Sequence, residues 1–131
     1  EYAHRLAQRF WPGPLTLVVQ AKEGVHKEFL DERGTIALRC PDSEVVRELI
    51  LASGAPIAAT SANTSGARPP RHYHELEDRI KAAADVVLDG GSTHHGMPST
   101  VVDCTTAEPT ILREGAIPGI DILSTARGED N

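Results

Sequence analysis

The sequence predicts an α/β (α+β) fold in which helices flank a sheet, and two observations lead to this prediction. The 131 residues are 40% hydrophobic and 24% charged, which is the composition of one globular domain rather than of a disordered or fibrous chain. Short apolar runs alternate with amphipathic segments, the order expected when helices cover a sheet. A chain of this length buries about two thirds of the surface that it exposes when unfolded, so a core needs no disulfides.

The first forty residues predict one helix and two strands. Residues 1–10 predict a helix without an N-terminal capping residue, since apolar side chains recur at every fourth position: Tyr2, Leu6 and Phe10. The next four residues predict a turn, because prolines interrupt a helix: Trp11-Pro12-Gly13-Pro14. The apolar runs 15–19 and 35–39 predict two buried strands.

The clearest helix follows residue 41. Asp42 or Ser43 can cap it, Gly54 can end it, and four residues form its apolar stripe: Val45, Val46, Leu49 and Ile50. After a polar loop over 61–70, residues 73–83 predict a second amphipathic helix. Short apolar runs predict the remaining strands: 56–60, 86–88, 99–102 and 109–113. We expect one domain over 1–120 and a loosely ordered tail over 121–131.

The charge balance argues against a general nucleic-acid-binding protein. Lys and Arg total 13 against 19 Asp and Glu, so the net charge is −6 and we expect no strong direct nucleic-acid binding. Ten of the 13 basic residues are arginine, which binds carboxylates and phosphates in a planar geometry. This favours small anionic ligands, although an arginine-rich proteome would give the same count.

The cysteines and the hydropathy pattern predict a cytoplasmic protein. Cys40 and Cys104 lie far apart in an ordinary composition, which favours two free thiols in a reducing compartment. No apolar stretch is long enough to span a bilayer, and no signal-peptide pattern opens the chain. We therefore expect no membrane partner.

Polar residues gather just after the predicted strands. Arg39 and Arg113 each end a strand, the polar segment 61–66 follows another, and Gly90-Gly91 follows a fourth. Ligands of α/β sheets bind outside the strand ends, so these positions predict a shared pocket. Ordinary turn chemistry explains the composition of 61–66 equally well, because Ser, Asn and Gly are common turn residues.

Known catalytic and metal motifs do not match. Gly91 and Gly96 have P-loop spacing, but Met97 and Pro98 replace the Lys and the Ser or Thr, and no G-x-G-x-x-G occurs. No G-x-S-x-G elbow supports a Ser-His-Asp triad. We expect no metal site and interpret the histidines as solvated loop residues: His72, His74, His94 and His95. No catalytic residue is identified.

Five motifs carry a resemblance to a known family. They are, in order, Phe10-Trp11-Pro12-Gly13-Pro14-Leu15-Thr16, Arg39-Cys40-Pro41, Ala59-Thr60-Ser61-Ala62-Asn63-Thr64-Ser65-Gly66, Leu88-Asp89-Gly90-Gly91 with Gly96-Met97-Pro98-Ser99-Thr100-Val101-Val102-Asp103, and Ile111-Leu112-Arg113-Glu114-Gly115-Ala116-Ile117. Together they resemble the YrdC-like family of threonylcarbamoyl-AMP synthases.

This resemblance implies a fold and a reaction. The fold would be a twisted mixed sheet with helices that encloses a concave, positively lined ligand cavity. The reaction would condense L-threonine, bicarbonate and ATP into threonylcarbamoyl-AMP and pyrophosphate, with magnesium bridging the phosphates. A downstream threonylcarbamoyl transferase would then use the product to modify tRNA.

The resemblance also implies roles for individual residues. Arg39 would hold the threonine carboxylate, with the Ala59 backbone and the Ser99 hydroxyl completing the amino-acid site. The ATP site would be lined by four further residues: Thr35, Ser61, Asn63 and Arg113. Pro69 stands at an ATP-site position where the family often has Ser, so a hydroxyl contact would be lost or replaced by the backbone.

The start of the chain departs from the family pattern. Family members carry an N-terminal portion with a Pro-Thr segment and a Lys-x-Arg pair, and this chain begins after both. We expect it to correspond to the C-terminal two thirds of a synthase and to be poorly active alone. Two alternatives stay open: a non-catalytic nucleotide- or RNA-binding module of the same fold, and the carbamoyl-transfer domain of hydrogenase-maturation proteins.

Overall fold

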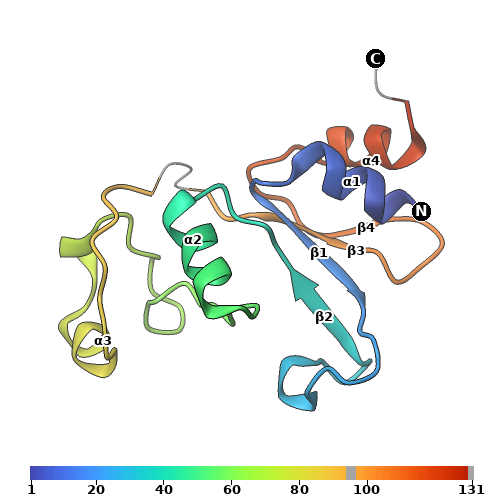
Figure 1. Cartoon of the computed structure of the whole chain (residues 1–131). Helices are drawn as coiled ribbons and strands as arrows, with labels where there is room; N and C mark the ends of the chain where they lie inside the picture. Colours follow the sequence, from blue (N-terminus) through green and yellow to red (C-terminus); the bar gives the residue numbers. More distant parts are fainter. Residues whose placement is uncertain (94–96, 130–131) are drawn as a thin grey trace. The chain divides into compact units, whose positions relative to one another are not determined.

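The computed structural model describes residues 1–93 and 97–129, which fall into two compact units (Figure 1). Unit 1 comprises Glu1–Val46 and Met97–Asn131, and unit 2 comprises Arg47–Gly96. The single domain over 1–120 stays a prediction, and the two compact units are described separately below.

Unit 1 is built on a four-stranded mixed sheet. Its strands are β1 (Leu15–Gln20), β2 (Thr35–Leu38), β3 (Thr100–Asp103) and β4 (Thr110–Arg113), in the order β2-β1-β3-β4. β1 runs parallel to β3, and the two edge strands are antiparallel to their neighbours. Helices α1 (Tyr2–Phe10) and α4 (Gly119–Arg127) pack side by side (Figure 1). The predicted sheet flanked by helices is confirmed.

Side chains along β1 point alternately to the two faces of the sheet, and the buried ones mark the face that the helices cover. Leu15 and Leu17 point to one face and are buried with Val102 of β3, Leu6 of α1 and Ile122 of α4. Successive strand residues point to opposite faces, so the intervening side chains lie on the other face. The apolar core therefore holds the strands against the two helices.

The prediction of a loosely ordered tail from residue 121 is wrong for 121–127, where α4 forms. Ile122 and Ala126, four residues apart, are buried against the core together with Thr125. Gly128 ends the helix with a φ of +76°, a conformation that glycine adopts without strain. The tertiary contact with α1, rather than local propensity, accounts for this helix. Residues 130–131 lie outside the described residues.

The predicted turn after α1 is confirmed and is tied to the end of β2. The Trp11–Pro12 peptide bond is cis, and the Gly13 N–H donates to the Cys40 carbonyl at 2.9 Å. A Cβ at Gly13 would lie 2.4 Å from the Phe10 carbonyl oxygen, so only glycine fits. A short 3₁₀ helix, η1 (Lys27–Phe29), lies between β1 and β2.

The predicted helix after residue 41 is confirmed as α2 (Glu44–Ser53). The Ser43 hydroxyl accepts from the Val46 N–H at 3.4 Å, as an N-cap does, and Gly54 follows with a φ of +67°. The second predicted helix is interrupted: residues 73–83 form η2 (Tyr73–Glu75) and α3 (Asp78–Ala83). Leu76 and Glu77 between them are extended, with ψ of 130° and 137°.

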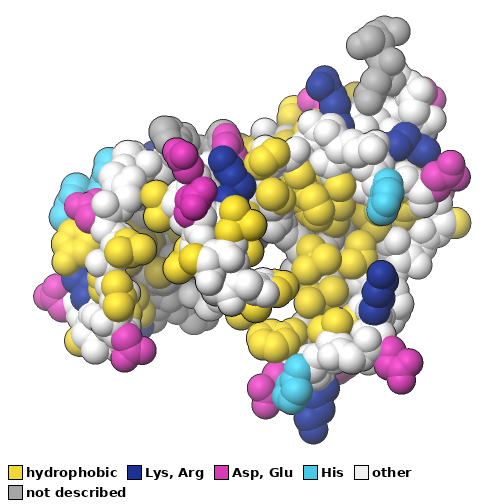
Figure 2. Space-filling view, viewed as in Figure 1, with side chains coloured by type: hydrophobic (Ala, Val, Ile, Leu, Met, Phe, Trp, Pro, Cys, Tyr) yellow, Lys and Arg dark blue, Asp and Glu magenta, His cyan; other side chains and the backbone are white. Residues whose placement is uncertain are grey.

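The strands predicted over 56–60 and 86–88 are not formed. Both runs are largely exposed, with Val86 73% and Leu88 63% accessible, and neither pairs with a strand within the described part of the chain. A strand needs a partner for its backbone groups, which an apolar run alone does not supply. Figure 2 shows groups of apolar side chains left on the surface.

Candidate functional site

The register of the sheet places four polar residues at one end of it. β1 and β3 start at this end, whereas β2 and β4 finish there. Leu17 pairs with Leu38 in antiparallel register, so Thr16 lies opposite Arg39. Ser99 directly precedes β3, and Arg113 ends β4. We call Arg39, Thr16, Ser99 and Arg113 the polar row.

Three members of the polar row are joined by hydrogen bonds. The hydroxyls of Thr16 and Ser99 lie 2.8 Å apart. The Arg113 guanidinium donates from Nη2 and Nε to the Ser99 carbonyl, at 2.8 and 3.2 Å, and from Nη2 to the Ser99 hydroxyl at 3.2 Å. Ser99, at the centre of this network, is buried, whereas Arg113 is exposed.

Arg39 is held by the turn that precedes β1. Its Nε donates to the Gly13 carbonyl at 3.0 Å. The polar row thus has a guanidinium at the end of each edge strand and two hydroxyls between them. Guanidinium groups bind carboxylates and phosphates through paired hydrogen bonds, so this end of the sheet suits an anionic ligand.

The side chain of Thr100, which directly follows Ser99 of the polar row, is buried and fixes the segment after Arg113. Its hydroxyl donates to the Ile117 carbonyl at 2.7 Å and accepts from the N–H groups of Gly115 and Ile117 at 3.0 and 3.1 Å. A Cβ at Gly115 would lie 2.3 Å from the Pro98 carbonyl oxygen. Neither Thr16 nor Thr100 was predicted as a functional position, although both are hydroxyl residues within apolar strand runs.

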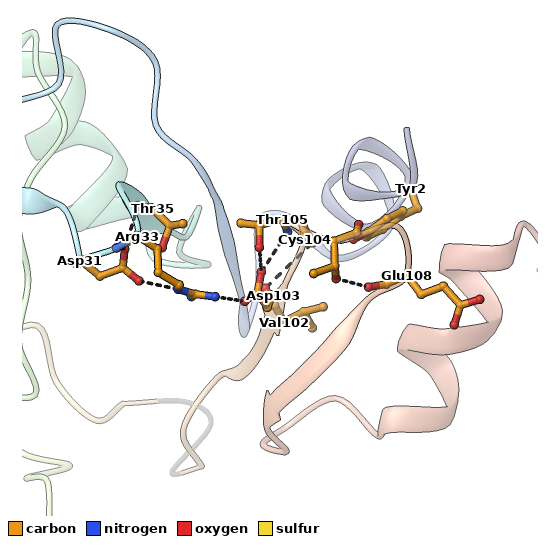
Figure 3. A network of polar contacts seen from close by, with 10 residues as sticks. Tyr2, Asp31, Arg33, Thr35, Val102, Asp103, Cys104, Thr105 and Glu108 are labelled. Atoms are coloured by element: carbon orange, nitrogen blue, oxygen red, sulfur yellow. Dashed lines mark hydrogen bonds and ion pairs between the residues drawn. The ribbon is translucent and has the colours of Figure 1, made fainter.

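The opposite end of the sheet carries a second polar network, around Thr35 (Figure 3). Thr35 begins β2, and its N–H donates to Asp31 at 2.8 Å. Arg33 lies between two carboxylates, with Nε 3.1 Å from Asp31 and Nη1 2.8 Å from Asp103. The sequence predicted both Thr35 and Arg113 at one ATP site, but the structure places them at opposite ends of the sheet.

Hydrogen bonds keep both carboxylates of this network ionised. The Thr35 backbone N–H, followed by its hydroxyl, lowers the pKa of Asp31 to about 2. The Thr105 hydroxyl, followed by Arg33, lowers the pKa of Asp103 to about 2. The network links the loop before β2 to the end of β3.

The remaining predicted site residues lie in unit 2. In the 61–66 segment the Asn63 amide donates to the carbonyls of Thr64 and Ala67, at 2.8 and 2.9 Å. Ala62 has a φ of +53°, which is uncommon for a residue other than glycine. Ala59 and Ser61 are exposed and lie outside the helices and strands, rather than at a strand end.

Pro69 lies at a surface hollow of about 430 Å³. Two arginines, Arg68 and Arg71, also line it, together with Pro70, His72 and Glu75. The Glu75 carboxylate accepts from the Arg71 N–H at 2.7 Å. The hollow thus combines cationic side chains with one carboxylate that is already bonded to the backbone.

The histidines do not form a metal centre in the part of the chain that is described. The rings of His72 and His74 stack with centroids 5.2 Å apart, and no group of three or more potential ligand residues occurs in 1–93 and 97–129. His94, His95 and Gly96 lie outside the described residues.

Both cysteines are free, as predicted. Burial, followed by the nearby charge of Asp103, raises the pKa of the Cys104 thiol to about 11. This thiol is therefore protonated at neutral pH and is a poor nucleophile. No helix in the described ranges is both long and apolar enough to cross a membrane.

Comparisons with known proteins identify relatives of this chain. The family model Sua5_yciO_yrdC, described as "Telomere recombination", matches residues 1–115. The chain is 42% identical over 118 residues to the threonylcarbamoyl-AMP synthase of Pyrococcus abyssi, and 41% identical over 122 residues to that of Bacillus subtilis. These matches cover 90% and 89% of this chain but 35% and 34% of the relatives, so the chain spans about a third of their length.

Solved structures agree with this comparison. The crystal structure of P. abyssi Sua5 complexed with L-threonine matches with a TM-score of 0.87 and 41% identity, covering 97% of this chain and 37% of that one. The crystal structure of Escherichia coli YciO matches with a TM-score of 0.81 and 28% identity, covering 92% and 59%. The YrdC-like fold predicted from the five motifs is therefore confirmed.

Proposed function

Because this chain belongs to the Sua5/YciO/YrdC family, we propose that it forms the part of an L-threonylcarbamoyladenylate synthase that holds the threonine carboxylate and part of the nucleotide. The observation that carries the proposal is the polar row, in which Arg39 follows edge strand β2 and Arg113 ends edge strand β4, with the hydroxyls of Thr16 and Ser99 between them. The relatives' names favour this synthase over the RNA-binding and carbamoyl-transfer alternatives.

In the proposed reaction, the amino group of threonine adds to bicarbonate to give a carbamate and water. A carbamate oxygen then attacks the α-phosphorus of ATP. The bond between this phosphorus and the oxygen that bridges it to the β-phosphorus breaks. The products are threonylcarbamoyl-AMP and pyrophosphate. Such a displacement depends on alignment and charge neutralisation rather than on a strong base, which suits a site rich in guanidinium and hydroxyl groups.

Within unit 1 we assign the amino-acid site to Arg39 and the Ser99 hydroxyl, while a role for the Ala59 backbone of unit 2 stays a prediction of the family resemblance. The support for Arg39 is its planar guanidinium at the end of β2, with Nε anchored on the Gly13 carbonyl. The support for Ser99 is its buried hydroxyl, which Thr16 and Arg113 hold in one orientation. A carboxylate bound by Arg39 would accept two parallel hydrogen bonds.

Within unit 2 we assign nucleotide contacts to Ser61, Asn63 and Pro69. Roles for Thr35 and Arg113, which lie at opposite ends of the sheet in unit 1, stay predictions of the family resemblance. The bent backbone of the 61–66 segment supports a role for Ser61 and Asn63, because unusual backbone conformations cluster at ligand sites. Arg68 and Arg71, which line the hollow at Pro69, support a phosphate-facing position there.

We propose that magnesium binds together with the ATP phosphates rather than at a separate site on the protein. The polar row offers hydroxyl oxygens but no carboxylate, whereas magnesium is usually held by one or two carboxylates together with substrate phosphates. When bound, the ion would neutralise phosphate charge. We further propose that the adenylate passes to a threonylcarbamoyl transferase that modifies tRNA, and that the protein acts in the cytoplasm.

The proposal is tested with a hybrid enzyme in which this chain replaces the matched 118-residue region of the P. abyssi synthase. We expect pyrophosphate release that requires L-threonine, bicarbonate and ATP together, measured by omitting each in turn. A hybrid that folds by circular dichroism but binds neither L-threonine nor ATP would contradict the proposal.

A further inference from the structure

The segment 61–66 holds a conformation that its own residues do not favour. Ala62 has a φ of +53°, a region in which the Cβ of an L-residue crowds the backbone. The Asn63 side-chain oxygen is buried and has no hydrogen-bond partner among the described residues. Both features raise the free energy of this conformation, so contacts from other residues are needed to stabilise it.

Some of the support comes from within the segment and its neighbour. The Asn63 amide bonds the carbonyls of Thr64 and Ala67, and the Ala67 N–H donates to the Thr64 carbonyl at 2.9 Å. These bonds close a turn, but they connect it to nothing outside residues 63–67. Local bonds alone therefore leave the turn free to move as a body.

The external anchor is Glu77, thirteen residues further along the chain. Its Oε1 accepts from the Thr64 N–H at 3.0 Å, and both of its carboxylate oxygens lie 2.7 Å from the Thr64 hydroxyl. Arg79 completes the cluster: its Nε donates to Glu77 at 3.0 Å and its Nη2 donates to the Thr64 hydroxyl. The carboxylate thus binds the backbone of the segment directly.

The local backbone explains why Glu77 is available for this contact. Glu77 occupies the N-cap position of α3, is extended rather than helical, and forms no side-chain cap of that helix. Its side chain faces Thr64 instead, and Arg79 in the first turn of α3 binds the same carboxylate. The anchor therefore fixes the segment to a helix that begins at the next residue.

We propose that Glu77 is a positioning residue for the nucleotide: through Thr64 it holds Ser61 and Asn63 in the arrangement that binds ATP. This inference rests on the proposed function. Glu77 itself contacts no substrate, so its removal changes how often the segment occupies the binding conformation rather than which groups contact the ligand.

The test compares variants of this chain by calorimetric titration with ATP and magnesium. We expect Glu77→Ala to weaken ATP binding about tenfold, since apparent affinity falls with the fraction of molecules in the competent conformation. Glu77→Gln keeps an oxygen that can accept from Thr64 and should recover most of that loss. Asp78→Ala is the matched control, because Asp78 is the adjacent acid, is fully exposed and lies 3.8 Å from Lys81.

Amide hydrogen exchange supplies a readout that does not depend on ATP. The amides of Thr64 and Ala67 should exchange faster in Glu77→Ala, while those of β1 and β3 should be unchanged. Equal ATP affinity in the wild type and Glu77→Ala would overturn the positioning role. So would a general loss of protection that Glu77→Gln does not restore.

The two hypotheses fail in different ways. A wild-type chain that binds no ATP would contradict the proposed nucleotide role of the 61–66 segment, and with it the role of Glu77. A wild-type chain that binds ATP as tightly as Glu77→Ala does would leave the proposed function standing and reject only the positioning role.

Discussion

Replacing Thr100 by valine tests how much its buried hydroxyl stabilises unit 1. The side chain is fully buried, and its hydroxyl serves the Ile117 carbonyl and the N–H groups of Ile117 and Gly115. Valine has nearly the same shape but leaves these backbone groups unpaired. Each buried unpaired group costs about 1 to 3 kcal/mol, and the added methyl group returns roughly 0.8 kcal/mol. Gly115 is only partly buried, so the two groups of Ile117 carry most of the penalty. At about 2 kcal/mol for each of them, less the gain from the methyl group, we expect a net loss of about 3 kcal/mol in the free energy of unfolding.

Urea unfolding followed by tryptophan fluorescence measures this loss. The single tryptophan, Trp11, lies in unit 1 and donates to the Leu15 carbonyl at 2.8 Å, so its signal reports on this unit. The expected loss lowers the urea midpoint by roughly 1 to 2 M. Thr100→Ser keeps the hydroxyl and should lose less, and Thr110→Val at an exposed strand position is the control. A Thr100→Val midpoint equal to that of the wild type would refute the reasoning.

Three further predictions concern binding, pH and thiol chemistry. Arg39→Lys keeps the charge but loses the planar fork, so calorimetry should show about tenfold weaker L-threonine binding with unchanged ATP binding; equal losses would count against the assignment. The folded-state pKa values of Asp31 and Asp103, about 2, lie below the ordinary 3.8, so their stabilisation is present above pH 4 and is lost as the pH falls toward 2. The melting temperature of Asp103→Asn should therefore change less over this range than that of the wild type, and parallel curves would contradict the network. Cys104, with a pKa of about 11, should react with iodoacetamide at pH 8 more slowly in the native protein than in urea, as measured by mass spectrometry; equal rates would contradict its burial.

Local patterns were enough to predict the elements of unit 1 that sit on the core. The spacing of Tyr2, Leu6 and Phe10 predicted α1, and the apolar run after Pro14 predicted β1. Leu6 is buried in the core, and Tyr2 and Phe10 pack partly buried against it. Helix α4 was missed because its order depends on packing against α1, which no local pattern reveals.

Unit 2 shows where local patterns fail. The apolar runs 56–60 and 86–88 resemble strands, but pairing is a property of two segments and neither run has a partner in the described part of the chain. The periodicity over 73–83 suits one helix, yet Glu77 is extended and bonds Thr64 instead. A contact over thirteen residues thus overrides the helical pattern.

Some residues of the candidate site could be predicted from local sequence, and others could not. Arg39 and Arg113 were predicted because each ends an apolar strand, and Ser99 followed only from the family resemblance. Thr16 became part of the site through the parallel register of β1 and β3, which brings together residues 83 positions apart. Register between distant strands cannot be derived from either strand alone.

The most direct test of the central claim is a titration of the ¹⁵N-labelled chain with L-threonine, followed by amide chemical shifts. The account predicts shifts concentrated at Thr16, Arg39, Ser99 and Arg113, with D-threonine producing much smaller ones. Amides at the opposite end of the sheet, near Asp31, should not change. Shifts that cluster near Asp31, or a polar row that does not respond to saturating L-threonine, would contradict the assignment of this end of the sheet as the amino-acid site.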